Sequence, residues 1–242
     1  MDKRLIVALD YDNMPDVWQL VELLDDLVDF YKVGMELFYS AGVTAVKYLK
    51  SQGKDVFLDL KLHDIPNTVV KSAIFQTQLG VSLFNIHASG GKEMMTKTAK
   101  IVKETANKLD IYKPKLIAVT VLTSMNEEEW KNLNYSINIK EQVINLARLA
   151  KDSGLDGVVA SPEEAESIRK ECGDDFLIVT PGIRPQGSIL NDQSRVATPK
   201  SAIEAGSNYL VVGRPITKAP NPRESALNIL QEMGLEINDW TR

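Results

Sequence analysis

Short runs of apolar and β-branched residues alternate along the chain with longer segments in which apolar residues recur every three or four positions. This alternation is typical of parallel strands that are joined by crossover helices. The pattern predicts eight strands, at residues 5–9, 31–34, 56–60, 83–87, 116–121, 157–160, 177–179 and 209–212.

The segments between these strands have the pattern of helices. Apolar residues from Val17 to Val28 form the stripe of a helix that packs against a sheet. Glycines stand where later helices are expected to end, at Gly53, Gly80, Gly154, Gly173 and Gly206. With no linker-like stretch, eight such units predict one domain over residues 1–242, a single (β/α)8 TIM barrel. A doubly wound open sheet is the alternative, but no GxGxxG sequence follows the first strand to favour it.

Two connections are longer than a barrel needs, at residues 122–137 and 181–198. Both follow the carboxyl ends of predicted strands, which is the face where barrel enzymes carry their active sites. Long loops without obvious structure often close over ligands, so we expect the ligand site near these two connections.

The third predicted strand carries charges on one face. In the segment VFLDLKLHDIPN, the two-residue period of a strand separates three leucines from Phe57, Asp59 and Lys61. We expect the leucines to face the helices, which points Asp59 and Lys61 into the barrel. An unpaired charge there would cost on the order of several kcal/mol, so the two must pair or meet a ligand. An ion pair that only fills the barrel is the structural alternative.

The same parity appears at the ends of three other strands. It points Asp10, Lys32, Asn85 and His87 toward the barrel interior. Agreement among four strand ends favours a functional site over an isolated ion pair. His87 is compatible either with a hydrogen-bonded core imidazole or with a group that supports the site.

Asp64 has two interpretations. An Asp just before Pro66 and a helical segment is typical of an N-cap. However, Asp59, Lys61 and Asp64 form D-x-K-x-x-D, which places two carboxylates and an ammonium at the mouth of one strand. His63 has the opposite parity and is expected to be structural or solvent-facing.

A phosphate site is predicted near the other end of the chain. After the eighth strand, Gly213 lets backbone approach a ligand, and Arg214 supplies a planar donor fork. Arg184 and Gln193 add donors from the connection after the seventh strand, and barrels often bind phosphate with these two loops. A surface arginine after a turn is the alternative for Arg214 alone.

Composition narrows the partners and the compartment. With 28 basic and 33 acidic residues, the net charge is -5, so we expect no nucleic-acid partner. Cys172 is the only cysteine, which excludes an internal disulfide and suits a reducing cytoplasm, and no Cys or His cluster has zinc-site spacing. The first apolar run is only residues 5–9, unlike a secretory leader. No run approaches the roughly 20 residues of a membrane-spanning helix, so we expect a soluble protein.

Six blocks in the chain, in order, are VALD, YKVG, LDLKLHDIPNT, LTS, TPGIRP and VVGRPI. In these blocks the chain resembles the orotidine 5'-monophosphate decarboxylase family, in its bacterial form, along nearly its whole length. The resemblance implies a cofactor-independent carboxy-lyase that converts orotidine 5'-monophosphate to uridine 5'-monophosphate and carbon dioxide in de novo pyrimidine biosynthesis. It also implies a homodimer whose active sites are shared across the interface.

The resemblance further implies roles for individual residues. Lys61 would be the proton donor in a charged network with Lys32, Asp59 and Asp64, in which the neighbouring subunit provides Asp64. The implied substrate contacts are Asp10 and Lys32 at the ribose, Asp59 near the carboxylate, Ile65, Thr68 from the partner chain, Thr123 or Ser124 at the pyrimidine, and Arg184, Gln193, Gly213 and Arg214 at the phosphate.

Two rival functions fit parts of the sequence. Sugar-phosphate decarboxylases or aldolases of the same superfamily resemble the chain in D-x-K-x-x-D but use magnesium, and Lys32 would repel a metal where they carry an acidic ligand. A catalytically silent barrel that binds a phosphate ligand is the second rival. The intact Lys61 argues against it.

Overall fold

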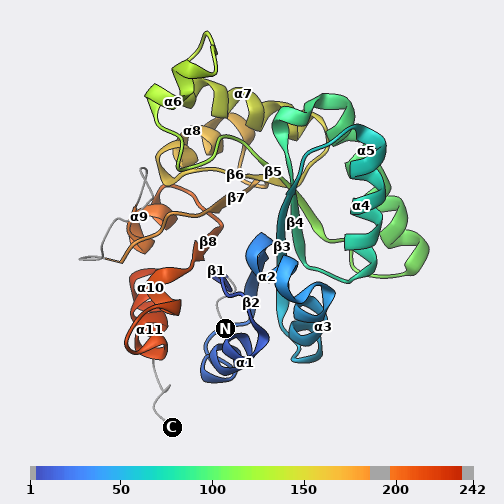
Figure 1. Ribbon diagram of the computed structural model, residues 1–242. Helices are drawn as coiled ribbons and strands as arrows, with labels where there is room; N and C mark the ends of the chain where they lie inside the picture. The colour runs from blue at the N-terminus through green and yellow to red at the C-terminus, as the bar shows by residue number, and fades with distance from the viewer. Residues whose placement is uncertain (1–3, 186–196, 236–242) are drawn as a thin grey trace.

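The structure, a computed structural model, describes residues 4–185 and 197–235. Its eight parallel strands pair in chain order, and the last pairs with the first to close a barrel. In Figure 1 the strands lie at the centre of the molecule and the helices surround them. The strands are β1 (Leu5–Ala8), β2 (Phe30–Gly34), β3 (Asp55–Leu62), β4 (Leu83–His87), β5 (Lys115–Val119), β6 (Gly157–Val159), β7 (Leu177–Thr180) and β8 (Tyr209–Val212).

Helices connect successive strands, and two further helices follow β8. They are α1 (Met14–Leu23), α2 (Met35–Ala41), α3 (Val43–Ser51), α4 (Pro66–Gln78), α5 (Gly91–Leu109), α6 (Glu127–Asn132), α7 (Ile139–Asp152), α8 (Pro162–Cys172), α9 (Pro199–Glu204), α10 (Arg214–Thr217) and α11 (Pro222–Glu232), with a 3-10 turn at Ala88–Gly90. The predicted (β/α)8 barrel is therefore confirmed.

Two apolar layers hold the barrel together. The larger layer lies between strands and helices and contains Leu58, Tyr31 and Val33, all fully buried. The smaller layer fills the barrel and contains Phe57 and Val211 among others. The predicted alternation along the strands is therefore confirmed, because neighbouring residues of β3 belong to different layers.

Most predicted boundaries lie within two residues of those observed. The five glycines expected at helix ends all have positive φ, from 70° to 101°, a conformation that glycine adopts without strain. The first helix ends at Leu23, earlier than its apolar stripe, and Val28 is buried beyond it. The connection 122–137 is not structureless as expected: it contains α6, which lies beside α7 at the edge of the fold (Figure 1).

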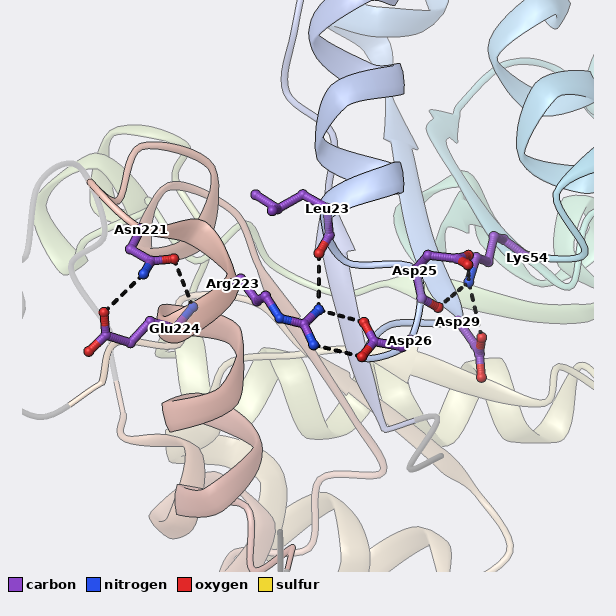
Figure 2. Close-up of polar contacts among 8 residues, drawn as sticks. All are labelled: Leu23, Asp25, Asp26, Asp29, Lys54, Asn221, Arg223 and Glu224. Atoms are coloured by element: carbon purple, nitrogen blue, oxygen red, sulfur yellow. Dashed lines mark hydrogen bonds and ion pairs between the residues drawn. The ribbon is translucent and has the colours of Figure 1, made fainter. Parts of the chain in front are cut away.

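Ion pairs close the ring where the two ends of the chain meet. Arg223 of α11 donates to both carboxylate oxygens of Asp26 and to the carbonyl of Leu23 at the end of α1 (Figure 2). Nearby, the buried ammonium of Lys54 lies 2.8 Å from Asp25 and 3.3 Å from Asp29. The contacts of Arg223 join segments that are almost 200 positions apart in the sequence, at 197 between Arg223 and Asp26.

Candidate active site

Charged side chains form a continuous row across the ends of β1, β2 and β3. The Lys61 ammonium donates to Asp59 Oδ1 at 2.7 Å, and Lys32 Nζ lies 3.6 Å from Asp59 Oδ2. Lys32 also donates to Asp10 Oδ1 at 2.9 Å. The structure thus brings together four of the residues that the sequence predicted would meet inside the barrel.

Each buried charge in this row is stabilised by its neighbours. Burial alone would raise the pKa of the Asp59 carboxyl, but Lys32, Lys61 and hydrogen bonds outweigh it and hold that pKa below its usual range. Burial alone would lower the pKa of Lys32, but Asp59 and Asp10 outweigh it and raise that pKa. Asp59 and Lys32 are therefore both charged at neutral pH, which a buried pair permits only when each partner is present.

Two glycines let backbone approach these charges. A Cβ at Gly34 would stand 2.6 Å from Lys32 Nζ, so a side chain there would displace the ammonium from Asp10. A Cβ at Gly213 would stand 3.3 Å from Asp10 Oδ2. The segment predicted to bind phosphate therefore lies directly beside the ribose end of the predicted site. Gly34 was not among the predicted site residues, although it ends the block YKVG.

A cavity of about 240 Å³ opens beside the row of charges. Lys32, Asp59 and Lys61 line one side of it. Thr123 and Ser124 also line it, Thr123 buried and Ser124 exposed, so both candidates for the pyrimidine contact reach the same space. The remaining wall is mainly apolar and includes Val119, Val121, Val159, Val179, Pro181 and Val211.

A larger cavity, of about 540 Å³, lies at the opposite end of the barrel. Its lining includes the first residues of five strands, for example Phe30 of β2 and Tyr209 of β8. Barrel enzymes carry their chemistry at the carboxyl ends of the strands. We therefore assign the site to the smaller cavity, where the buried charges converge.

Asn85 supports this site and was missed as a functional residue. It is only 1% exposed, and its side chain accepts from the backbone N–H of Lys61 at 2.8 Å and donates to Asp59 at 2.7 Å. Its inward position on β4 follows from the two-residue period of the strand. Its partners do not, because pairing across strands depends on register.

The two histidines lie together at the rim. His63 is exposed, as expected, and stacks on His87 with ring centroids 5.1 Å apart. Burial, followed by the charges of His63 and Lys61, lowers the pKa of His87 to about 4. His87 is therefore neutral at pH 7 and adds no positive charge beside Lys61.

The family model for the orotidine 5'-phosphate decarboxylase / HUMPS family matches residues 3–229. A protein from Trichlorobacter lovleyi named orotidine 5'-phosphate decarboxylase is 48% identical over 230 residues, covering 95% of each chain. A relative of the same name from Pseudoalteromonas translucida is 51% identical over 220 residues, covering 91% of this chain and 92% of its own. The chain belongs to this decarboxylase family.

Solved structures of the decarboxylase family agree with this assignment. The orotidine 5'-phosphate decarboxylase of Lactobacillus acidophilus superposes with a TM-score of 0.82 at 44% identity, covering 97% of this chain and 100% of its own. The family predicted from the six sequence blocks is therefore confirmed, and with it the enzyme class, a carboxy-lyase.

The segment that follows β3 exposes three of the predicted site residues to solvent in the single chain. Asp64, Ile65 and Thr68 are all exposed, and Ile65 is 67% exposed. The N-cap of α4 is Ile65, without a side-chain cap, while Asp64 accepts from the N–H of Ile65 at 2.6 Å. The interpretation of Asp64 as the N-cap is therefore wrong, whereas Pro66 does begin the helix as expected.

Three of the four residues predicted to bind phosphate lie in the described part of the chain. Arg214 is exposed at the start of α10, next to Gly213. Arg184 is 8% exposed and donates to the carbonyl of Ile183 at 2.9 Å. Gln193 lies outside the described residues.

The described residues contain neither a metal-binding cluster nor a membrane-spanning helix. Among residues 4–185 and 197–235, no group of three or more His, Cys, Asp or Glu side chains is arranged to hold a metal ion. Within the described part of the chain, no helix combines the length and the apolar character needed to cross a membrane.

Proposed function

We propose that this chain decarboxylates orotidine 5'-monophosphate to uridine 5'-monophosphate without a cofactor, as a cytoplasmic step of pyrimidine biosynthesis. The observation that carries the proposal is the Lys61 ammonium, which lies 2.7 Å from the buried Asp59 carboxylate on the wall of the cavity. Family membership narrows the reaction to the one that the relatives' names state.

The proposed chemistry requires a cation at a fixed place. When the bond from the pyrimidine ring to the carboxylate breaks, carbon dioxide leaves and the electron pair remains on the ring carbon. A preorganised ammonium stabilises this developing charge, because it needs no reorganisation as the charge forms. Lys61 then transfers a proton to the ring carbon, so that the carbanion becomes the C–H bond of the product.

Substrate binding divides along the barrel. The valines of the cavity face the pyrimidine ring, and Thr123 or Ser124 contacts its polar edge. Asp10 and Lys32 bind the ribose hydroxyls, with Asp59 next to the departing carboxylate. Phosphate is held by Arg184, Gln193, Gly213 and Arg214, so that binding energy from this remote group orders the reacting end.

We also propose that a homodimer completes each site. Asp64, Ile65 and Thr68 are exposed, and within the described residues Asp64 forms only the local hydrogen bond to Ile65. An exposed isoleucine beside a carboxylate at the barrel mouth suits an interface that inserts these groups into the neighbouring site. In that arrangement Asp64 of one chain joins Lys32, Asp59 and Lys61 of the other.

The function is tested by the loss of ultraviolet absorbance when orotidine 5'-monophosphate is added to purified protein. We expect turnover that is unchanged after dialysis against a chelator. A sugar-phosphate substrate with added magnesium is the matched control, and turnover of that substrate alone would favour the rival enzyme of the same superfamily.

The shared site is tested by mixing two inactive homodimers, Lys61→Ala and Asp64→Ala. After subunit exchange, half of randomly formed dimers are heterodimers, each with one intact and one doubly altered site. Activity is therefore expected to approach roughly a quarter of the parent value. Verified heterodimers that stay inactive would show that Asp64 serves its own chain.

A further inference from the structure

The backbone of β3 is irregular where its charged side chains stand. Leu58 pairs with Phe84 and Leu62 pairs with Ile86, so residues 59–61 of β3 lie opposite Asn85 alone. Within this bulge Lys61 has a φ of 51°. A residue with a Cβ rarely adopts this left-handed conformation, and where it does, the surrounding structure must hold it.

Asn85 supplies two contacts that hold this arrangement. Its Oδ1 accepts from the backbone N–H of Lys61 at 2.8 Å, which fixes the left-handed residue. Its Nδ2 donates at 2.7 Å to Asp59 Oδ1, the same oxygen that accepts from the Lys61 ammonium. One amide therefore contacts both the backbone of Lys61 and the carboxylate that binds its side chain.

We propose that Asn85 is a positioning residue, which places the Lys61 ammonium for the reaction by fixing both the bulge of β3 and the Asp59 carboxylate. The inference rests on the proposed function, because it concerns the same site. Asn85 is buried and does not line the cavity, so it acts through Asp59 and Lys61 and not on the substrate. Asparagine provides a donor and an acceptor on a short side chain, and leucine or aspartate would lack one or both.

A merely structural role is the alternative, because any buried amide that satisfies a backbone N–H stabilises the fold. Asn208 offers a matched control. Its Oδ1 accepts from the N–H of Ile178 at 2.8 Å and from Arg169 at 2.7 Å, next to the first residue of β8. Both asparagines thus bind a strand backbone, but only Asn85 contacts the charged row.

The experiment compares kcat and KM of the variants Asn85→Ala, Asn85→Asp and Asn208→Ala. Each kcat is calculated per folded protein, with the folded fraction measured by circular dichroism. Asn85→Asp keeps the side-chain size and provides a second variant if the alanine variant folds poorly. Both Asn85 variants are expected to lose about a hundredfold in kcat with KM changed by less than about threefold, because a small displacement of a catalytic group has that effect. Asn208→Ala should lower Tm and leave kcat within about twofold.

Values of kcat within about threefold of the parent in both Asn85 variants would overturn the proposal. A crystal structure of Asn85→Ala adds a readout that does not depend on turnover. We expect Lys61 to leave the left-handed region or to separate from Asp59, and an unchanged φ and ion pair would contradict the positioning role. If the parent protein does not decarboxylate the nucleotide, the proposed function is wrong. The crystal structure of Asn85→Ala still shows whether Asn85 positions Lys61.

Discussion

The two halves of the barrel differ in what they present to the cavity. Strands β1 to β4 and their ends carry the charged row with Lys32, Asp59 and Lys61, whereas β5 to β8 present mainly valines. A charge on the valine side would have no partner and would cost several kcal/mol, on the order expected for an unpaired buried ion. Under the proposed function, the charged half performs the chemistry and the valine half receives the pyrimidine ring.

The charged half is also the irregular half. Its pairing of β3 with β4 changes register, while β5, β6 and β7 pair residue by residue. Regular strands continue the apolar layer inside the barrel up to the cavity, as Val179 and Val211 do. Charged groups need specific partners, and a bulge is one way in which a strand redirects a side chain toward them.

Of the substitutions at Asp59, Arg214 and Val159, the one at Asp59 to asparagine is expected to have the largest effect. It leaves the buried Lys32 and the partly buried Lys61 as neighbouring cations without their shared carboxylate. We expect a loss of roughly 3 kcal/mol in the free energy of unfolding and at least about a hundredfold in kcat. Denaturant titration and steady-state kinetics measure the two.

Asp156→Asn is the control for this change. Asp156 pairs with Lys113 at 2.7 Å but does not line the proposed site. It should reduce stability and leave kcat unchanged. Equal losses of kcat in both variants would mean that the charged row acts only through folding.

Arg214→Ala is expected to have an intermediate effect. Removing charge-assisted hydrogen bonds to phosphate should reduce kcat/KM for the nucleotide roughly 30-fold, which corresponds to a loss of about 2 kcal/mol in transition-state stabilisation. The kcat/KM for the nucleoside orotidine, which lacks the phosphate, should be almost unaffected. The control variant Arg223→Ala should leave kcat/KM unchanged for both substrates. Equal losses on nucleotide and nucleoside would contradict the assignment of Arg214 to phosphate.

The smallest effect is expected on the apolar half, for Val159→Thr. A hydroxyl of similar size against the ring should raise KM by about threefold to tenfold with little change in kcat, because it weakens apolar contact without touching the reacting atoms. Val158→Thr is the control on the same strand. Val158 faces the helices, so that variant should lower Tm without changing KM. A fall in kcat for Val159→Thr that matches that for Asp59→Asn would contradict the division between the halves.

The fold could be predicted from sequence because its signals are local and repeated. The two-residue period of β3 placed Phe57 and Leu58 in different layers, and five glycines marked helix ends. Helix α6 was not predicted, although Asn126 and Glu129 form a capping box that the sequence N-E-E-E shows. The helix has only 6 residues, most of them polar, so it lacks the apolar stripe from which longer helices were predicted.

The site could be predicted only in part. The two-residue period of the strands placed Lys32, Asp59 and Lys61 inside the barrel. The left-handed backbone of Lys61 could not be predicted, because glycine is the residue that usually marks this conformation and position 61 is a lysine. The partners of Asn85 depend on a shifted register between β3 and β4, which residue types do not specify. The role of Asp64 depends on a second copy of the chain, so it stays a prediction.

The proposed function depends above all on the ammonium of Lys61, which stabilises and then protonates the carbanion. Its most direct test is the rate of decarboxylation of orotidine 5'-monophosphate by Lys61→Ala, measured beside the parent protein under the same conditions. We expect a fold that survives, by circular dichroism, and a turnover reduced by more than about a thousandfold. A Lys61→Ala protein that keeps turnover within roughly tenfold of the parent would contradict this role of Lys61.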